Sequence, residues 1–144
     1  SGPHSNGYTL IRKLFDGDKE IGKQLVEPTR IYVKEVMNLI KQVDVHGIAH
    51  ITGGGLDNIN RINNNFQYVI DNPLPVPSVF DWLQKKGEVE DSEMYRTFNM
   101  GMGMIIIVNK NDAEKSVSIL GSDAQIIGSV RNGKGVEHSS LKTD

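Results

Sequence analysis

The sequence feature that most constrains the fold is an apolar segment that runs into three glycines and then into a helical pattern. Residues 46–51 contain the strand-like run, and Gly53, Gly54 and Gly55 follow it. Over residues 56–62, large apolar side chains recur at the spacing of one helix face. Consecutive glycines leave the backbone free to adopt positive φ and let another group approach it closely. The stretch therefore predicts a strand, a tight turn and a helix.

The same stretch has the form of an anion-binding turn. A helix that begins after a glycine turn points unpaired N–H groups and a partial positive charge into that turn. Such an arrangement most often binds phosphate. His50 and Thr52 precede the glycines and can donate hydrogen bonds to an anion, which favours a binding site. The alternative is a strand-to-helix connection that binds nothing, and the glycines alone leave both interpretations open.

A second polar, glycine-containing loop lies at residues 1–7, and the apolar residues of 10–15 follow at helical spacing, which predicts a helix that starts near Asn6. Ser5 or Asn6 is predicted to cap this helix. Capping alone would account for both residues, and a lone histidine such as His4 is most often an ordinary surface residue. The chain opens without methionine, so we expect it to be a piece of a longer protein.

The remaining elements are predicted from periodicity, proline positions and polar breaks. They are a loop over 16–22, a helix over 30–42, a strand over 67–71, an extended segment over 72–78, a helix over 78–86, a helix starting within 88–96, a strand over 105–108 buried on both faces, a helix over 111–120, a strand over 124–130, and a turn with a tail over 131–144. This order predicts one sheet with helices packed on it in one domain. Small glycines in 98–104, just before a buried strand, indicate close packing or a ligand.

Composition excludes several classes of function. A formal charge of −2 and a pI near 6.1 argue against a general nucleic-acid binder. With no cysteine, the chain has no disulfide and no thiolate chemistry. No metal-ligand spacing occurs, so no metal site is expected here. No apolar run approaches the roughly 20 residues of a membrane span, and no signal peptide is expected. Cytoplasm is the expected location.

Catalytic motifs of other enzyme classes are also missing. The chain has neither the GxSxG nucleophile motif nor the GxxxxGK[ST] phosphate loop. The residues by themselves support a domain that handles phosphate or a nucleotide, and no particular reaction.

Three stretches together carry a family resemblance. They are S-G-P-H-S-N-G-Y-T-L-I-R-K at 1–13, A-H-I-T-G-G-G-L-D-N-I at 49–59 and F-N-M-G-M-G-M at 98–104, supported by E-P-T-R-I-Y-V-K at 27–34 and I-I-G at 126–128. They resemble the C-terminal half of phosphoribosylformylglycinamidine cyclo-ligases, also called aminoimidazole ribonucleotide synthetases. The H-I-T-G-G-G form favours this family over the related selenophosphate synthetases, hydrogenase-maturation proteins and thiamine-phosphate kinases. The departures, Asp57-Asn58 and the asparagines at 63–65, are small.

The resemblance implies an α+β fold of the α/β-sandwich type, in which helices flank a mixed β-sheet. Residues 1–144 would be the single C-terminal domain of a two-domain enzyme. The N-terminal domain would supply dimerisation and most contacts to ATP and Mg²⁺. The implied reaction is the ATP-dependent closure of formylglycinamidine ribonucleotide to aminoimidazole ribonucleotide, with ADP and phosphate as the other products. The implied partners are this small-molecule substrate and, for the full-length enzyme, a second copy in a homodimer.

The resemblance also implies residue roles. His50 is the candidate for proton transfer or for stabilising developing charge. The other candidate residues are His4, Ser5, Asn6 and Gly7 for the ribonucleotide and its phosphate; Thr52, Gly53, Gly54 and Gly55 for a backbone phosphate cradle; and Asn99, Gly101 and Gly103 for the cleft floor.

Two other interpretations stay open. The chain could be a ribonucleotide-binding or regulatory module without catalysis of its own. It could also belong to a related ATP-dependent kinase or synthetase that keeps the glycine turn and uses a different acceptor.

Overall fold

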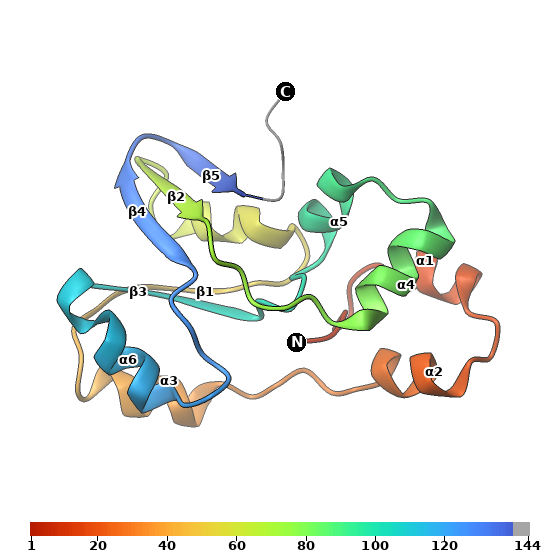
Figure 1. The fold of residues 1–144 in the computed structure, drawn as a ribbon, viewed down its shortest axis with the longest axis horizontal. Helices are drawn as coiled ribbons and strands as arrows, with labels where there is room; N and C mark the ends of the chain where they lie inside the picture. The colour runs from red at the N-terminus through yellow and green to blue at the C-terminus, as the bar shows by residue number, and fades with distance from the viewer. Residues whose placement is uncertain (140–144) are drawn as a thin grey trace.

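The computed structural model describes residues 1–139 and shows helices arranged around two small sheets (Figure 1). The helices are α1 (Tyr8–Leu14), α2 (Lys19–Leu25), α3 (Val33–Ile40), α4 (Ser78–Gly87), α5 (Asp91–Thr97) and α6 (Ala113–Leu120), with 3₁₀-helices η1 (Gly55–Arg61) and η2 (Lys110–Asp112). The strands are β1 (Val45–His50), β2 (Phe66–Ile70), β3 (Met104–Val108), β4 (Gly128–Asn132) and β5 (Gly135–His138). The expected α+β fold with a mixed sheet is confirmed.

The prediction of one sheet is wrong. Strands β1 and β3 form an antiparallel pair, and β4, β2 and β5 form a separate sheet in that order. In the second sheet β2 runs antiparallel to β4 and parallel to β5, so this sheet is mixed. The expected central strand at 105–108 is β3, which pairs within residues 1–139 only with β1. An apolar run indicates that both faces of a strand are shielded, but it does not say how many neighbours the strand has.

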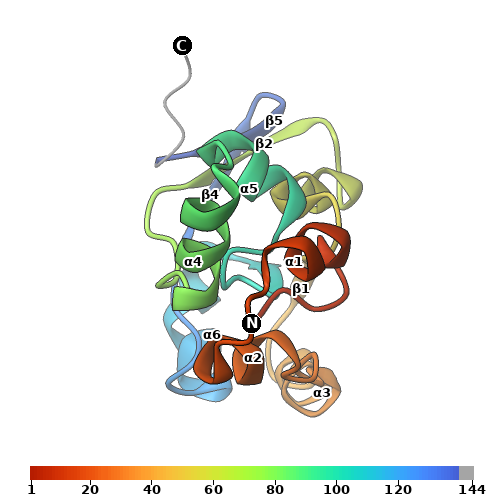
Figure 2. The ribbon, with the colours of Figure 1, turned by 90° about the vertical axis from the view of Figure 1, so that its right-hand side faces the viewer.

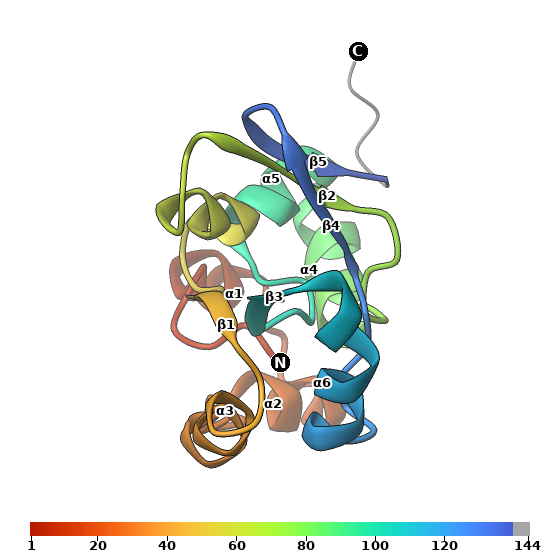
Figure 3. The same cartoon turned by 90° about the vertical axis from the view of Figure 1, so that its left-hand side faces the viewer.

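The space beside β3 explains its apolar side chains. An apolar hollow of about 750 Å³ is lined by residues of α3, β2, β3, α6 and β4 and by the segment that leads into β4. Helices α3 and α6 pack against each other beneath the β1–β3 pair, and Figure 3 shows them on the same side of it. Only Ile105 of β3 is buried and the other four residues are half-buried, because the strand lines this hollow; the prediction of a strand buried on both faces is therefore wrong.

Two hydrophobic clusters form the core. The first joins α1, α2, α4 and α5 and contains Phe80, Leu83 and Met94. These helices gather at the right-hand end of the molecule in Figure 1, and Figure 2 views them from that end. The second cluster joins β1, β2, β3 and η1 and contains Ile51 and Ile59. Partly buried Tyr95 packs against both clusters.

Helix α2 lies where a loop was expected. Asp18 caps the helix, since its carboxylate accepts hydrogen bonds from the N–H groups of Glu20 and Ile21. Charged residues and Gly22 conceal the helical spacing of Ile21 and Leu25. Neither Ser5 nor Asn6 caps α1, because the N-cap is Gly7 in the left-handed region with φ of 65°.

Two other boundaries differ from the predicted ones. Helix α3 begins at Val33 rather than at residue 30, after an extended approach. The last predicted strand begins only at Gly128, and β5 was missed in the expected tail. Strand β5 pairs with β2, far away in sequence, so no local pattern marks it. The rest of that predicted tail, 140–144, lies outside the described residues.

Candidate functional site

The glycine turn and the segment before β3 meet because β1 and β3 are antiparallel. His50, at the end of β1, is paired with Met104 at the start of β3. One residue further, the Ile51 N–H donates to the Gly103 carbonyl at 2.9 Å. Residues 52–55, here called the glycine loop, therefore begin beside the 99–103 segment.

Residues 1–7, here called the N-terminal loop, complete the site. The side-chain amide of Asn99 donates to the Gly2 carbonyl at 2.8 Å, and the Ser1 amine donates to the Gly101 carbonyl at 3.3 Å. Asn6 lies beside the glycine loop, since a Cβ on Gly53 would be 2.8 Å from its side-chain oxygen. Three stretches that are far apart in sequence thus form one surface.

The two histidines of this surface lie next to each other. The rings of His4 and His50 have centroids 5.9 Å apart, and His4 Nδ1 is 3.4 Å from the Asn99 amide nitrogen. Burial lowers the pKa of His4 below its ordinary value of 6.5, and the neighbouring His50 and the N-terminal amine lower it further. His4 is therefore held neutral near neutral pH, so one ring nitrogen can donate and the other accept. His50 is exposed and open to a ligand.

The glycines of the loop are required by its geometry. Gly54 and Gly55 have φ of 95° and 54°, in the left-handed region. A Cβ on Gly55 would collide with the backbone carbonyl of Tyr95 on α5. Glycine is therefore required here for two reasons, the positive φ of the turn and its close packing against α5.

The helix after the glycine loop has the predicted length but is more tightly wound than an α-helix. Residues Gly55–Arg61 form a 3₁₀-helix instead of an α-helix. A single 3₁₀-helix of this length contributes little aligned dipole, so the helix N-terminus is not what would attract an anion here. The donors come from the loop itself: within residues 1–139 the N–H groups of Gly53 and Gly54 have no hydrogen-bond acceptor.

The 99–103 segment acts as the floor under both loops. Asn99 is 1% exposed, and its side-chain oxygen accepts from the Gly101 N–H at 2.8 Å. Gly101 has φ of 96°, and an added Cβ would lie 2.8 Å from the Pro75 carbonyl. At Gly103 a Cβ would collide with the hydroxyl groups of Tyr32 and Ser1. These glycines are explained by packing, which leaves the floor without a side chain between the loops.

The side chain of Ser5 does not contribute to the contacts that bring the loops together. It is exposed, and within the described chain its hydroxyl makes no hydrogen bond. His4, Asn6 and Gly7 do contact other parts of the molecule. Gly7, for example, packs so close to the Phe98 ring that a Cβ there would collide with it.

Sequence reasoning missed two residues of this surface. The Tyr32 ring lies 6.0 Å from the His50 ring at 63°, and its hydroxyl is 2.5 Å from Ser1 Oγ. Asn58, on η1, donates from its side-chain amide to carbonyls of the glycine loop. Tyr32 lies in the resembling stretch 27–34 and Asn58 in the resembling stretch 49–59, which was the available signal, although Asp57-Asn58 was also noted as a departure from the family pattern.

Arg30 lies next to Tyr32 at the edge of the site. Its guanidinium lies 5.6 Å from the centre of the Tyr32 ring. It also pairs with Asp123 at 2.9 Å and with Glu35 at 3.2 Å. Arg30 is therefore engaged at the edge of the site and fixes the segment that carries Tyr32.

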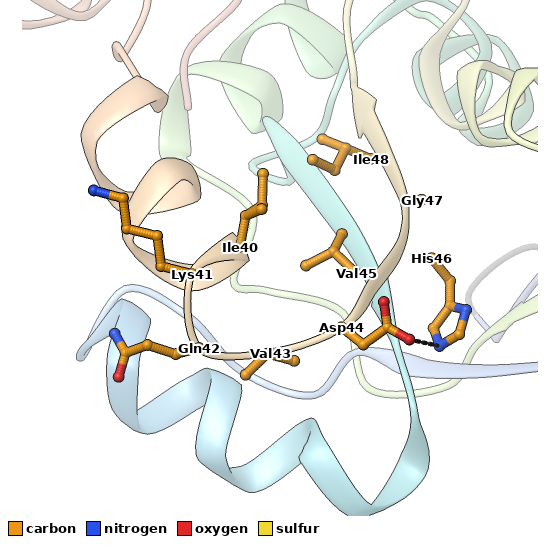
Figure 4. A pocket seen from close by; sticks show the side chains of 9 residues that line it. All are labelled: Ile40, Lys41, Gln42, Val43, Asp44, Val45, His46, Gly47 and Ile48. Atoms are coloured by element: carbon orange, nitrogen blue, oxygen red, sulfur yellow. Dashed lines mark ion pairs between the residues drawn. The ribbon is translucent and has the colours of Figure 1, made fainter.

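Part of the site borders one of the two hollows, because Arg30, Tyr32 and Met102 line the hollow beside β3. The glycine loop lines neither the hollow beside β3 nor a second one between the end of α3 and β1. Figure 4 shows that the second is formed by residues 40–48, in which Asp44 and His46 lie 3.8 Å apart. All residues that line this second hollow come from one continuous stretch of the chain. It therefore does not bring together polar groups from distant parts of the sequence.

Two searches of the described residues found nothing. In residues 1–139 there is no group of three or more His, Asp or Glu side chains that could hold a metal ion. No helix in that part of the chain is long and apolar enough to cross a membrane.

Comparison with known proteins identifies the relatives of this chain. It is 43% identical over 148 residues to a protein of Methanopyrus kandleri named phosphoribosylformylglycinamidine cyclo-ligase, with 94% of this chain and 43% of the relative covered. Proteins of the same name from Methanosarcina acetivorans and Methanosarcina mazei are 44% and 45% identical, with 90% of this chain and 42% of each relative covered. The chain thus spans less than half the length of these relatives.

A family model matches all of the described residues. The model is described as AIR synthase related protein, C-terminal domain, and it matches residues 1–139. The three stretches that form the candidate surface all lie inside the match. The chain therefore belongs to the AIR synthase related protein C-terminal domain family.

Proposed function

We propose that this chain is the C-terminal domain of a two-domain, ATP-dependent cyclo-ligase. The enzyme would convert formylglycinamidine ribonucleotide to aminoimidazole ribonucleotide, ADP and phosphate. The names of relatives at 43–45% identity support this activity. The observation that carries the proposal is the meeting of the N-terminal loop, the glycine loop and His50 on one surface.

In this proposal the two loops bind the ribonucleotide through its phosphate. The free N–H groups of Gly53 and Gly54 would donate to phosphate oxygens, and Thr52 and the side chains of His4 and Asn6 lie close enough to add donors. Backbone donors in a glycine loop suit phosphate because no side chain blocks its approach. Ser5, Gly7 and Gly55 would shape the two loops, and Asn99, Gly101 and Gly103 would support them.

The reaction needs an activated oxygen and a correctly placed nitrogen. ATP would phosphorylate the formyl amide oxygen, an internal nitrogen would attack that carbon, and the carbon–oxygen bond would break as phosphate leaves. Holding both ends of one substrate in place reduces the entropic part of the barrier. His50 is the proposed group for the proton lost by the attacking nitrogen, because its ring is exposed next to the cradle.

ATP and Mg²⁺ are assigned to the rest of the polypeptide. Within residues 1–139 no set of side chains fits a metal ion. The proposal therefore routes no step through a metal held by this domain. The full-length enzyme is proposed to be a cytoplasmic homodimer that pairs through its other domain.

A calorimetric titration tests the binding half of the proposal. The chain is titrated with formylglycinamidine ribonucleotide and, separately, with ATP. We expect saturable binding of the ribonucleotide that is lost in His4→Ala and in Gly54→Val. Gly17→Val is the matched control, because Gly17 also has positive φ, at 93°, and nothing lies within 4 Å of an added Cβ. Binding of ATP alone would favour a kinase-like relative and overturn the assignment of the N-terminal loop.

Turnover of the full-length enzyme tests the role of His50. If His50 moves a proton, His50→Ala lowers kcat by at least about 100-fold at saturating substrate. If it only orients the loop, KM rises and kcat is nearly kept. A full-length protein that binds the ribonucleotide but never turns it over with ATP would instead support the binding-module interpretation.

A further inference from the structure

Asn58 is a buried side chain that contacts most of the glycine loop. It lies on η1 and is 4% exposed. Its side-chain NH₂ group donates to the backbone carbonyls of Thr52 at 3.4 Å, Gly53 at 3.2 Å and Gly55 at 2.7 Å. One amide group therefore gathers three carbonyl oxygens of a single turn.

This arrangement determines which way the peptide N–H groups point. In a planar trans peptide the C=O of one residue and the N–H of the next point in opposite directions, and no peptide bond in the described chain is cis. The carbonyls of Thr52 and Gly53 are directed at the Asn58 amide. The N–H groups of Gly53 and Gly54 are therefore directed away from it, and both glycines are exposed.

The unpaired donors agree with this direction. The N–H groups of Gly53 and Gly54 find no acceptor within residues 1–139. The next donor in the loop, the Gly55 N–H, is already used, because it donates to the Thr52 carbonyl at 3.0 Å. Two adjacent free donors on an exposed glycine turn form the kind of concavity that takes an anion.

The side-chain oxygen of Asn58 indicates that this residue serves through the donors of its NH₂ group. The Asn58 oxygen is buried and has no hydrogen-bond partner in the described part of the chain. Burying an acceptor without a partner is unfavourable. A hydrophobic residue would avoid that penalty, but it would leave the loop carbonyls without a common donor.

We propose that Asn58 is a positioning residue of the phosphate cradle: it holds the loop carbonyls inward so that the Gly53 and Gly54 N–H groups face the ligand. The proposal rests on the proposed function, in which this loop binds phosphate. Without Asn58 the Thr52 carbonyl is still held by the Gly55 N–H, but the Gly53 carbonyl loses its donor and its peptide is free to turn that oxygen outward, where it repels an anion.

The experiment compares four variants of the chain by NMR. Asn58→Asp keeps the shape but has no donor, and its carboxylate repels the three carbonyls. Asn58→Leu fills the space without polar groups, and Asn58→Ser keeps one shorter donor. The control is Asn72→Asp, because exposed Asn72 donates in the same way to one loop carbonyl, that of Ile126 at 2.8 Å, away from the site.

A first measurement needs no ligand. Residual dipolar couplings of the Gly53 and Gly54 N–H bonds report the orientation of these peptides in the free protein. We expect the Gly54 coupling to change most in Asn58→Asp and Asn58→Leu, because its N–H belongs to the peptide whose carbonyl Asn58 holds, and both couplings to be kept in Asn72→Asp. Couplings that stay at their wild-type values in a folded Asn58 variant would overturn the proposal, whatever the loop binds. If Asn58→Asp does not fold, Asn58→Leu and Asn58→Ser decide the matter.

The second measurement titrates inorganic phosphate into the same samples. We expect saturable shifts of the Gly53 and Gly54 amide signals in wild type and Asn72→Asp, and an apparent Kd at least tenfold higher in Asn58→Asp. Asn58→Ser should lie between them. Altered couplings with an unchanged phosphate Kd would overturn the role of Asn58 in binding. A third outcome is that the couplings change but the wild-type chain binds no phosphate. That result would contradict the proposed phosphate cradle, and Asn58 would then have no ligand-binding loop to position.

Discussion

At the scale of single residues, burial sets the charge of two histidines. Burial lowers the pKa of His4 and of His138 below 6.5, and His50 and the N-terminal amine add to the effect at His4. A lowered pKa in the folded state means that the unfolded chain binds more protons below pH 6.5. Stability is therefore fully present above that pH and is lost as the pH falls from 6.5 through the pKa of the folded state.

We predict that the melting temperature falls between pH 7 and pH 5, and that His4→Asn makes this fall shallower. Asparagine suits the position because His4 has φ of 57°, which asparagine tolerates. Thermal unfolding followed by circular dichroism at several pH values measures the slope. An unchanged slope in His4→Asn would show that His4 is not buried enough to contribute.

Substitutions at two glycines distinguish backbone strain from steric overlap as causes of lost stability. Gly55 and Gly17 both have positive φ, but a Cβ on Gly55 collides with the Tyr95 carbonyl while one on Gly17 has nothing within 4 Å. We predict that Gly17→Ala costs about 1–2 kcal/mol of left-handed strain and that Gly55→Ala costs about 1–3 kcal/mol more through overlap. Urea unfolding compares the two. Equal losses would mean that α5 moves away freely.

At the scale of elements, α3 shows how one amphipathic helix divides its apolar face. Leu39 is 0% exposed, whereas Met37, on the same helix, is 51% exposed. The sequence pattern predicts both as part of the apolar stripe, and only the packing of α6 and the sheets tells which of them is covered.

We predict that Leu39→Ala lowers the free energy of unfolding by about 2–5 kcal/mol, because it leaves a cavity in the core. Met37→Ala should change it by less than about 0.5 kcal/mol, as at most exposed positions. Both values come from chemical denaturation of the same chain. Similar losses at the two positions would indicate that the exposed side of α3 is covered in solution.

At the scale of the whole molecule, two hydrophobic clusters are joined through Tyr95. Its side chain packs against both, and its ring lies 4.4 Å from that of His138 between centroids, with the two planes tilted by 43°. Trp82, the single tryptophan of the chain, packs against the first cluster and so reports on that cluster.

We predict that the wild-type chain unfolds in one transition, and that Tyr95→Ala costs on the order of 2 kcal/mol and separates two transitions. Trp82 fluorescence follows the first cluster, and amide exchange of β2 follows the second. Coincident transitions are the mark of one cooperative unit. The control is Val79→Ala, which weakens the first cluster from inside and should keep the transitions together. Coincident transitions in Tyr95→Ala would show that Tyr95 is not the link.

The sequence by itself determined the local elements and the candidate stretches. Periodic apolar residues predicted α3, α4 and α6, and the run after the methionines predicted β3, because these patterns depend on neighbours along the chain. The glycine loop and the N-terminal loop were recognised from their residues, and the structure places them together.

Only the tertiary structure decided what the distant parts do to one another. The division into two sheets, the pairing of β5 with β2 and the neutral state of His4 arise from contacts between residues far apart in sequence. The same holds for Asn58, whose donors matter only because the chain folds the loop carbonyls onto them. A side chain's burial and its hydrogen-bond partners are properties of the folded packing, so no local pattern could specify them.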